Sequence, residues 1–438
     1  MVTPFSLKAL VDISQHESLS KVMTDLVIGL DDLSTVSKMT LGTVEAFHTW
    51  KSANCAQQSL LHTGVASDLL STALSNLPNL KAIHLRNFDS PTRYRDAGTG
   101  GRKWRSYGYS IDQLWSHTRN NQWGTLHDRI FQAVMSAIDR SSPRLEGLEV
   151  ILRGRGTELS DEAFACFHVL GDGLARTLNS LTKLHLDVYG NAISGPFIGY
   201  TLPATAHDGS DVIDPATTNL RSFLGLTANV TWLRLNFHKP MPLNPLQKNR
   251  FMKWLSLEPD CALSPGQLGW NDMNPAPVAL PLRRLDLGHI LIDFHAFQNL
   301  VSKFSSLEEL CLKVATIEVE DDDLYGNSDS DEDDCIWAKF IRGLPVSNPN
   351  LRRLTLSNLD EKYKTHNEPI VFFVIDQGGV PQSQWITTNV DQAELDQLAD
   401  MTWTQSRYEE WSGHDDVSTD EDMRDADGPT NDDLGSDD

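Results

Sequence analysis

The sequence predicts an α/β protein: an irregular leucine-rich-repeat-like solenoid with a curved parallel sheet and outer helices. Three observations predict it. The motif L-x-x-L-x-L recurs seven times, apolar residues at helical spacing precede most of its occurrences, and no single strand of this kind can bury its own leucine edge. Alternating helices and strands give a parallel sheet with helices on its outer side.

The seven motifs lie between residues 80 and 356, and in each the apolar residues alternate as they do in a half-buried strand. They read LKAIHL (80–85), LEGLEV (145–150), LTKLHL (181–186), VTWLRL (230–235), LRRLDL (282–287), LEELCL (307–312) and LRRLTL (351–356). Each strand needs a neighbour on both sides, so we expect them to stack in sequence order.

Apolar stripes predict a helix ahead of five of these strands. They run from Val65 to Leu77, Leu126 to Ile138, Phe164 to Leu178, Phe294 to Phe304 and Ile336 to Ile341. Ser160 is the expected N-cap of the third helix, because two acidic residues follow it in the first turn.

The repeats are irregular in length. Their first residues are 65, 36, 49, 52, 25 and 44 positions apart, whereas regular leucine-rich repeats are about 20–29 residues long. The surplus predicts long loops at 86–124, 190–217 and 258–281. The position that usually holds Asn or Cys after the motif holds Phe88, Arg153, Tyr189, His238, Ile290, Ala315 and Leu359. We therefore expect no asparagine ladder there.

The net charge of −23 comes almost entirely from two segments, 318–334 and 412–438, each of which contributes −10. The rest of the chain carries only −3. Runs of like charge repel one another and stay solvated. We therefore expect one solenoid domain over residues 1–411, with a disordered acidic insert at 318–334, and a disordered acidic tail at 412–438.

Composition and motifs limit the function. The chain has no run of 18 apolar residues and no secretory signal, so no membrane span is expected. Its five cysteines lie far apart, which indicates a reducing compartment, cytoplasmic or nuclear, and argues against a zinc site or disulfide framework. Phosphate-binding, nucleophile-elbow and zinc-protease motifs are missing from the sequence. We expect no enzyme and no cofactor.

Two segments have alternative interpretations. Residues 89–124 interleave Arg and Lys with Tyr and Trp, as single-stranded nucleic acid binding requires. Anchoring of the loop by stacked side chains explains the pattern more simply, and no nucleic-acid partner is expected. Residues 321–332 match half of a calcium-binding loop, but Tyr325 and Ser328 interrupt it. Acid-directed kinases suit Ser328, Ser330, Ser418 and Thr419, which are candidate phosphorylation sites.

Residues 5–33 (FSLKALVDISQHESLSKVMTDLVIGLDDL), then LKAIHLRNFDS…RYRDAG…KWRSYG (80–108) and paired N-x-L-x-x-L-x-L-D segments, resemble fungal F-box proteins. In that family an F-box docks a ubiquitin-ligase core and a leucine-rich-like region presents the substrate. The resemblance covers residues 5–360 and implies substrate recognition for ubiquitin ligation. The F-box would precede Phe5 and is not visible, so a ligase adaptor is an expected partner only if one lies upstream. Otherwise the chain is a stand-alone recognition module.

Partner binding is expected on the concave sheet face, where the residues beside each central leucine point away from the core. The expected protein-binding residues are His84, Arg86, Lys183, His185, Asp187, Trp232, Arg234, Arg284, Asp286, Glu309, Lys313 and Arg353. Trp232 stands out because an aromatic on a polar face is a frequent hot spot. Packing beneath the loop 190–217 is its alternative role.

The sequence therefore indicates a non-catalytic protein-interaction scaffold whose partner it does not name. An alternative is that the two acidic segments bind or chaperone basic proteins by charge. A third is an unrecognised enzyme on an α/β body. Binding through acidic runs would collapse at high salt, whereas binding through a shaped face would weaken only modestly.

Overall fold

A computed structural model describes residues 2–30, 43–87, 126–152, 158–189, 217–238, 245–259, 275–319, 335–363, 367–372, 381–388, 390–406 and 409. The predicted loops 86–124, 190–217 and 258–281 lie largely outside these residues. So do the acidic insert, apart from its first two residues, and the whole of the tail with its two candidate phosphorylation sites. Glu318, the first residue of the predicted insert, is the last residue of a strand.

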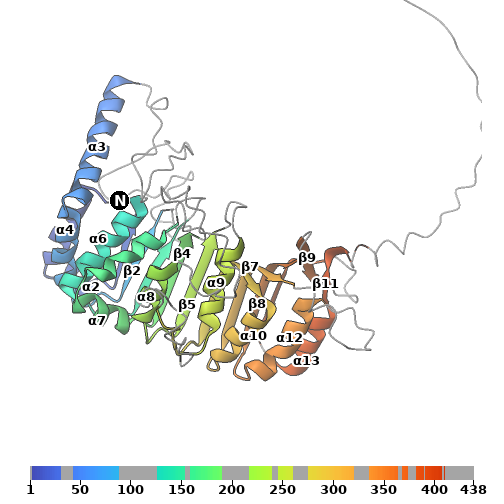
Figure 1. Cartoon of the computed structure of the whole chain (residues 1–438). Helices are drawn as coiled ribbons and strands as arrows, with labels where there is room; N and C mark the ends of the chain where they lie inside the picture. Colours follow the sequence, from blue (N-terminus) through green and yellow to red (C-terminus); the bar gives the residue numbers. More distant parts are fainter. Residues whose placement is uncertain are drawn as a thin grey trace, which may run out of the picture.

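Within these described ranges, eleven strands form one sheet. Their order from β1 to β9 follows the sequence (Figure 1). The strands are β1 (Asp25–Gly29), β2 (Ala82–Arg86), β3 (Gly147–Ile151), β4 (Lys183–Tyr189), β5 (Trp232–His238), β6 (Arg284–Asp293), β7 (Glu309–Glu318), β8 (Arg353–Lys362), β9 (Asn367–Phe372), β10 (Gln384–Thr387) and β11 (Thr402–Thr404). Every neighbouring pair from β1 to β8 is parallel. Each unit thus adds one strand beside the previous one, which confirms the predicted solenoid-like α/β architecture.

The helices lie side by side along one face of the sheet (Figure 1). They are α1 (Pro4–Gln15), α2 (Leu19–Val22), α3 (Val44–His62), α4 (Val65–Ser75), α6 (Leu126–Ser141), η3 (Asp161–His168), α7 (Asp172–Ser180), α8 (Thr218–Gly225), α9 (Pro245–Ser256), α10 (Phe294–Lys303), α12 (Ile336–Ser347) and α13 (Gln392–Asp400). Four of the five predicted helices are confirmed as α4, α6, α10 and α12. No helix among the residues described above is long and apolar enough to cross a membrane.

The prediction of one helix from Phe164 to Leu178 was wrong. A 3-10 helix, η3, ends at His168, and α7 begins four residues later. The start of α7 packs closely against α6. A Cβ atom at Gly173 would lie 1.9 Å from the carbonyl oxygen of Asp139, and the Asp139 carboxylate accepts a 2.9 Å hydrogen bond from the backbone N–H of Leu174. The carboxylate thus satisfies an orphan donor at the start of α7.

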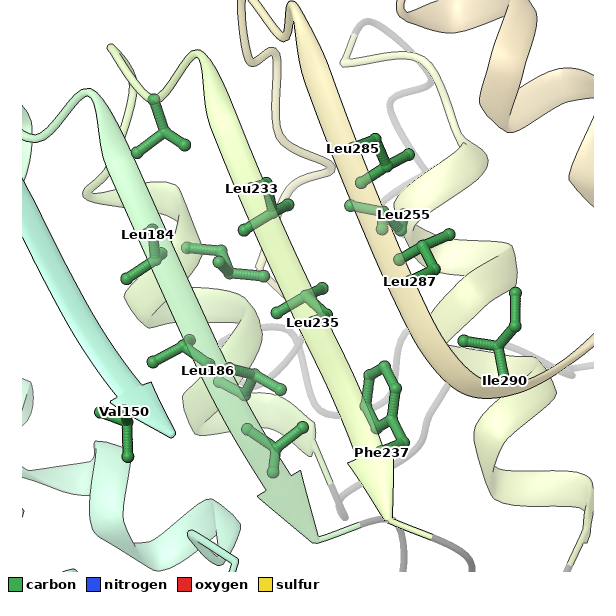
Figure 2. Close-up of a cluster of buried hydrophobic side chains, with 14 of the residues drawn as sticks. Val150, Leu184, Leu186, Leu233, Leu235, Phe237, Leu255, Leu285, Leu287 and Ile290 are labelled. Atoms are coloured by element: carbon green, nitrogen blue, oxygen red, sulfur yellow. The ribbon is translucent and has the colours of Figure 1, made fainter. Parts of the chain in front are cut away.

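The core lies between the sheet and the helices, and it is built from the motif leucines (Figure 2). Leu184, Leu233, Leu285, Leu310 and Leu354 occupy matching positions on neighbouring strands and are at most 1% exposed. Full burial of one such side chain stabilises a fold by about 1.5–3 kcal/mol. The predicted stacking of leucine edges is therefore the main source of cohesion between units.

Strands β6, β7 and β8 each contain one left-handed residue at the same level. His289, Val314 and Asn358 have φ angles of 53°, 55° and 51°. The extra residue lets each strand continue with its apolar side still facing the core. The core residues that follow are Ile290, Ala315 and Leu359, all at most 3% exposed. Apolar side chains thus fill the usual asparagine position in these strands, as expected.

Asparagines instead join the units at the opposite ends of the strands. Asn79 donates to the carbonyl of Lys21 at 2.6 Å, Asn229 to that of Asn179 at 2.8 Å, and Asn350 to that of Ser305 at 2.8 Å. Each of these residues comes directly before a motif strand. Each side chain therefore ties the start of one strand to the previous unit and satisfies a turn carbonyl.

Candidate binding face

The sheet face opposite the helices carries the polar residues that flank each central leucine; we call it the polar face. Strand register arranges its side chains in three rows across the sheet. The first row is Asp25, Ala82, Gly147, Lys183, Trp232, Arg284, Glu309 and Arg353. The second row is Val27, His84, Glu149, His185, Arg234, Asp286, Cys311 and Thr355. The third row includes Arg86, Ile151, Asp187, Asn236, Gly288, Lys313 and Ser357.

All twelve residues of the predicted binding set lie on the polar face, where they come from six strands, β2 and β4 to β8. Their role in binding stays a prediction. The four candidate phosphorylation sites lie outside the described residues. Asp25 was missed because β1 lacks the L-x-x-L-x-L motif. Only the alternation of apolar residues in DLVIG could have revealed that strand.

One cluster of charges on the polar face is centred on Glu149, which is 4% exposed. Its carboxylate lies 2.8 Å from His84 Nδ1, 2.5 Å from Lys183 Nζ and 3.4 Å from Arg86. Burial opposes ionisation of Glu149, but the hydrogen bonds from His84 and Lys183 outweigh it and hold its pKa well below the usual range. The hydrogen bond to Glu149 raises the pKa of His84, whose Nε2 also lies 3.1 Å from Asp25.

His185 lies beside this cluster, but unlike His84 it forms no hydrogen bond within the described residues, and its pKa is lowered. Its side chain is 6% exposed, and its Nδ1 lies 3.6 Å from Glu149 Oε1. Neither ring nitrogen has a hydrogen-bond partner. Burial lowers the pKa of His185 to about 4, so the ring is neutral at neutral pH.

Trp232 is held between two cations of its own face. The ring centroid is 4.2 Å from Lys183 Nζ and 4.2 Å from the guanidinium carbon of Arg284. The indole N–H donates to Asp286 at 3.0 Å, and His185 packs edge-on at 4.7 Å between centroids. Exposed cation–π contacts of this kind contribute about 0.5–1 kcal/mol each. Trp232 is thus positioned by charged neighbours, with part of its surface still accessible.

A second cluster of charges follows on β6 to β8. Arg284 lies 3.0 Å from Asp286 and 2.9 Å from Glu309, and Arg353 lies 3.4 Å from Glu309. The two acids of this cluster are therefore engaged by guanidinium groups. A partner would have to displace these contacts to use either carboxylate.

Three side-chain donors of the polar face take no part in either cluster of charges. Arg234, Asn236 and Lys313 make no hydrogen bond or ion pair through their side chains within the described part of the chain. Arg234 and Asn236 are half-buried and Lys313 is exposed. The polar face therefore presents two cations and one amide to solvent after its own acids have been paired.

Chemically, the polar face offers donors, cations and one aromatic ring. Cys311 contributes a thiol to the second row, and burial raises the pKa of that thiol. A protonated thiol is a poor nucleophile. Within the described ranges no group of three or more His, Cys, Asp or Glu residues could hold a metal ion. The arrangement suits non-covalent recognition.

Among known proteins, no family model matches this chain and no curated sequence is significantly similar to it. One similar solved structure is that of the leucine-rich-repeat-containing protein LegL7 from Legionella pneumophila. Identity is 12%, the match covers 81% of this chain and 87% of that one, and the TM-score is 0.25. The α/β architecture described here therefore rests on the strand order and register of this chain itself.

Proposed function

We propose that this chain is a non-catalytic protein-interaction scaffold and that its polar face receives the partner. The observation that carries the proposal is the set of unpaired donors on an otherwise paired surface, beside a partly accessible tryptophan held between two cations. Aromatic and Arg side chains at the centre of a surface are typical of interface hot spots. In the described part of the chain, the helices lie along the opposite face of the sheet (Figure 1).

The finer part of the proposal is substrate recognition for ubiquitin ligation, of the F-box and leucine-rich-repeat kind. Its support is the resemblance of residues 5–360 to fungal F-box proteins and the presence of a solenoid-like sheet. The proposal covers the recognition half of that function. Docking to a ligase adaptor would depend on an F-box, so recovery of the adaptor tests that half separately.

The test is capture of partners from the native cell extract by the full chain, followed by mass spectrometry at low and high salt. The face variant is Lys313→Glu with Arg353→Glu, since both side chains are exposed on the polar face. The matched control is Lys8→Glu with Lys339→Glu, since both lie exposed on the helix side. We expect salt-stable partners that the face variant loses at least tenfold and the control retains.

Partners retained equally by the face variant and the control would contradict binding at the polar face. Basic proteins that are lost at high salt from every variant would favour the acidic segments as the binding element instead. Salt-stable partners without the ligase adaptor would support the interaction scaffold and contradict a role in ubiquitin ligation.

A further inference from the structure

The three unpaired donors on the polar face lie around one glycine. Gly288 occupies the third row on β6, between Asn236 on β5 and Lys313 on β7. Arg234 is two residues before Asn236 on the same strand, and so on the same face. Because Gly288 has no side chain, β6 leaves a gap between two strands that carry donors.

The side chain of Asn236 lies over this gap. Its Oδ1 is 2.4 Å from the place that a Cβ atom on Gly288 would occupy. A larger residue at 288 would therefore displace the amide. The site thus combines a guanidinium, an amide and an ammonium group on neighbouring strands, the donor set that a carboxylate accepts from.

The acidic side chains near this site already form hydrogen bonds or ion pairs with other groups. Asp286, the nearest acid on β6, accepts from Trp232 and pairs with Arg284. Glu149 is enclosed by the cluster described above, and Asp187 accepts from the backbone N–H of Leu152 at 2.6 Å. The buried His185, without a hydrogen-bond partner, lies beside Arg234 in the second row and offers it no negative charge.

We infer that Arg234, Asn236 and Lys313 form a subsite for a carboxylate side chain of an acidic segment in a partner protein. The inference rests on the proposed function and adds the chemistry of the partner. Charge complementarity carries the assignment of the occupant, because the subsite presents two cations and no unpaired acid.

The overall charge of the chain does not oppose this assignment at short range. Of the net −23, −20 belongs to residues 318–334 and 412–438. Exposed charges are screened beyond about 8 Å at physiological salt. The contacts of the partner with the donors themselves therefore decide binding, and the acidic segments mainly slow the approach of an acidic partner.

The probe is a fluorescein-labelled peptide of six Glu-Gly repeats, with a Gln-Gly peptide as the neutral control, measured by anisotropy with the full chain. We expect the acidic peptide to bind at least tenfold more tightly than the neutral one. Arg234→Gln with Lys313→Gln should weaken acidic-peptide binding at least tenfold. The charge-matched control is Lys81→Gln with Arg283→Gln, two exposed residues outside the polar rows; it should change the affinity less than twofold.

Gly288→Ala tests the geometry without a change of charge. It should displace the Asn236 amide and lower the affinity for the acidic peptide several-fold. An unchanged melting temperature would show that the fold persists. An unchanged affinity in this variant and in the Arg234 and Lys313 variant would overturn the subsite.

The chain's own acidic tail is the competing occupant, and a full chain with Asp415→Asn, Asp416→Asn, Asp420→Asn, Glu421→Gln and Asp422→Asn tests it. Equal peptide binding by this variant and the natural chain supports a partner as the source. Peptide binding seen only in the neutralised variant would assign the subsite to the tail and overturn the inference. If extract partners depend on the polar face but the acidic peptide does not bind, the subsite fails and the proposed function stands.

Discussion

Strands β2 and β3 are five residues long, whereas β6, β7 and β8 are each ten residues long. We call β1 to β5 with their helices the short-strand half, and β6 to β8 with theirs the long-strand half. Both halves present the same row of leucines to the core. The long strands continue past a left-handed residue, and the short ones end before that point.

The two halves also join their helices differently. In the short-strand half, carboxylates from one unit cap the helix of another. Asp128 accepts two 3.0 Å hydrogen bonds from Ser160 at the start of η3, and Asp161 accepts from the backbone of Asn219 and Leu220 at the start of α8. In the long-strand half, α10 is capped by its own Asp293. The comparison teaches that both halves share the leucine core, to which the short-strand half adds carboxylate caps between helices and the long-strand half adds longer strand pairing.

The largest expected effect tests what the halves share. Leu184→Ala in the short-strand half and Leu310→Ala in the long-strand half should each lower the free energy of unfolding by about 2–5 kcal/mol, since both leave a cavity in the same core. Urea denaturation followed by circular dichroism measures it. A near-neutral result for either variant would show that its half does not belong to the common core.

The next effect is specific to the helix layer of the short-strand half. Gly173→Ala should cost about 1–3 kcal/mol, because its Cβ would overlap the Asp139 carbonyl oxygen and force α7 away from α6. The control is Gly225→Ala at the end of α8, where nothing lies within 4 Å of the new Cβ. Equal unfolding midpoints for the two variants would contradict close packing at the start of α7.

A pH dependence should distinguish the buried carboxylate cap in the short-strand half. Burial raises the pKa of Asp161 to about 7, despite its backbone hydrogen bonds. A raised folded-state pKa means that this stability is present at low pH and is lost as the pH rises toward 7. The natural chain should therefore lose about 2–3 kcal/mol more than Asp161→Asn between pH 5 and pH 8.

Chemical denaturation at four pH values measures this difference. His84, whose pKa is raised by its hydrogen bond to Glu149, also loses its contribution as the pH rises, but it is present in both chains and cancels. Parallel pH profiles for the natural chain and Asp161→Asn would show that Asp161 is ionised throughout.

The smallest effect belongs to the long-strand half. Val314 is β-branched and left-handed, with φ 55°, which is strained for such a residue. Val314→Asn should raise the free energy of unfolding by about 0.5–1 kcal/mol, because Asn tolerates this conformation. Asn358→Val, at the same level of the next strand, should lower it by about 1 kcal/mol. Shifts in the same direction would rule out backbone strain as the common cause.

The sequence could predict the leucine rows, since L-x-x-L-x-L fixes both the strand and its buried edge. It could not predict β1, which lacks the motif, or β10 and β11, whose antiparallel partners are distant in sequence. The hairpin of β8 with β9 also lacks the motif. The break between His168 and Asp172 was missed because an apolar stripe continues across it, and the packing of α7 against α6 is not visible in that local pattern.

The members of the polar face could also be predicted, because side chains alternate along a strand. The hydrogen bonds and ion pairs among these side chains could not be predicted. Whether Arg234 is free depends on how Arg284 and Trp232 share Asp286, a matter of side-chain geometry across three strands. The choice between packing and binding for Trp232 likewise depended on Lys183 and Arg284, which come from different repeats.

Hydroxyl-radical footprinting of the full chain, alone and with a captured partner, tests the central claim that the polar face is the binding surface. We predict that His84, Trp232 and Cys311 become less reactive on binding, while Phe5 and Val346 on the helix side do not change. Protection of Phe5 and Val346 with unchanged labelling of Trp232 would contradict the claim and move the interface to the helices.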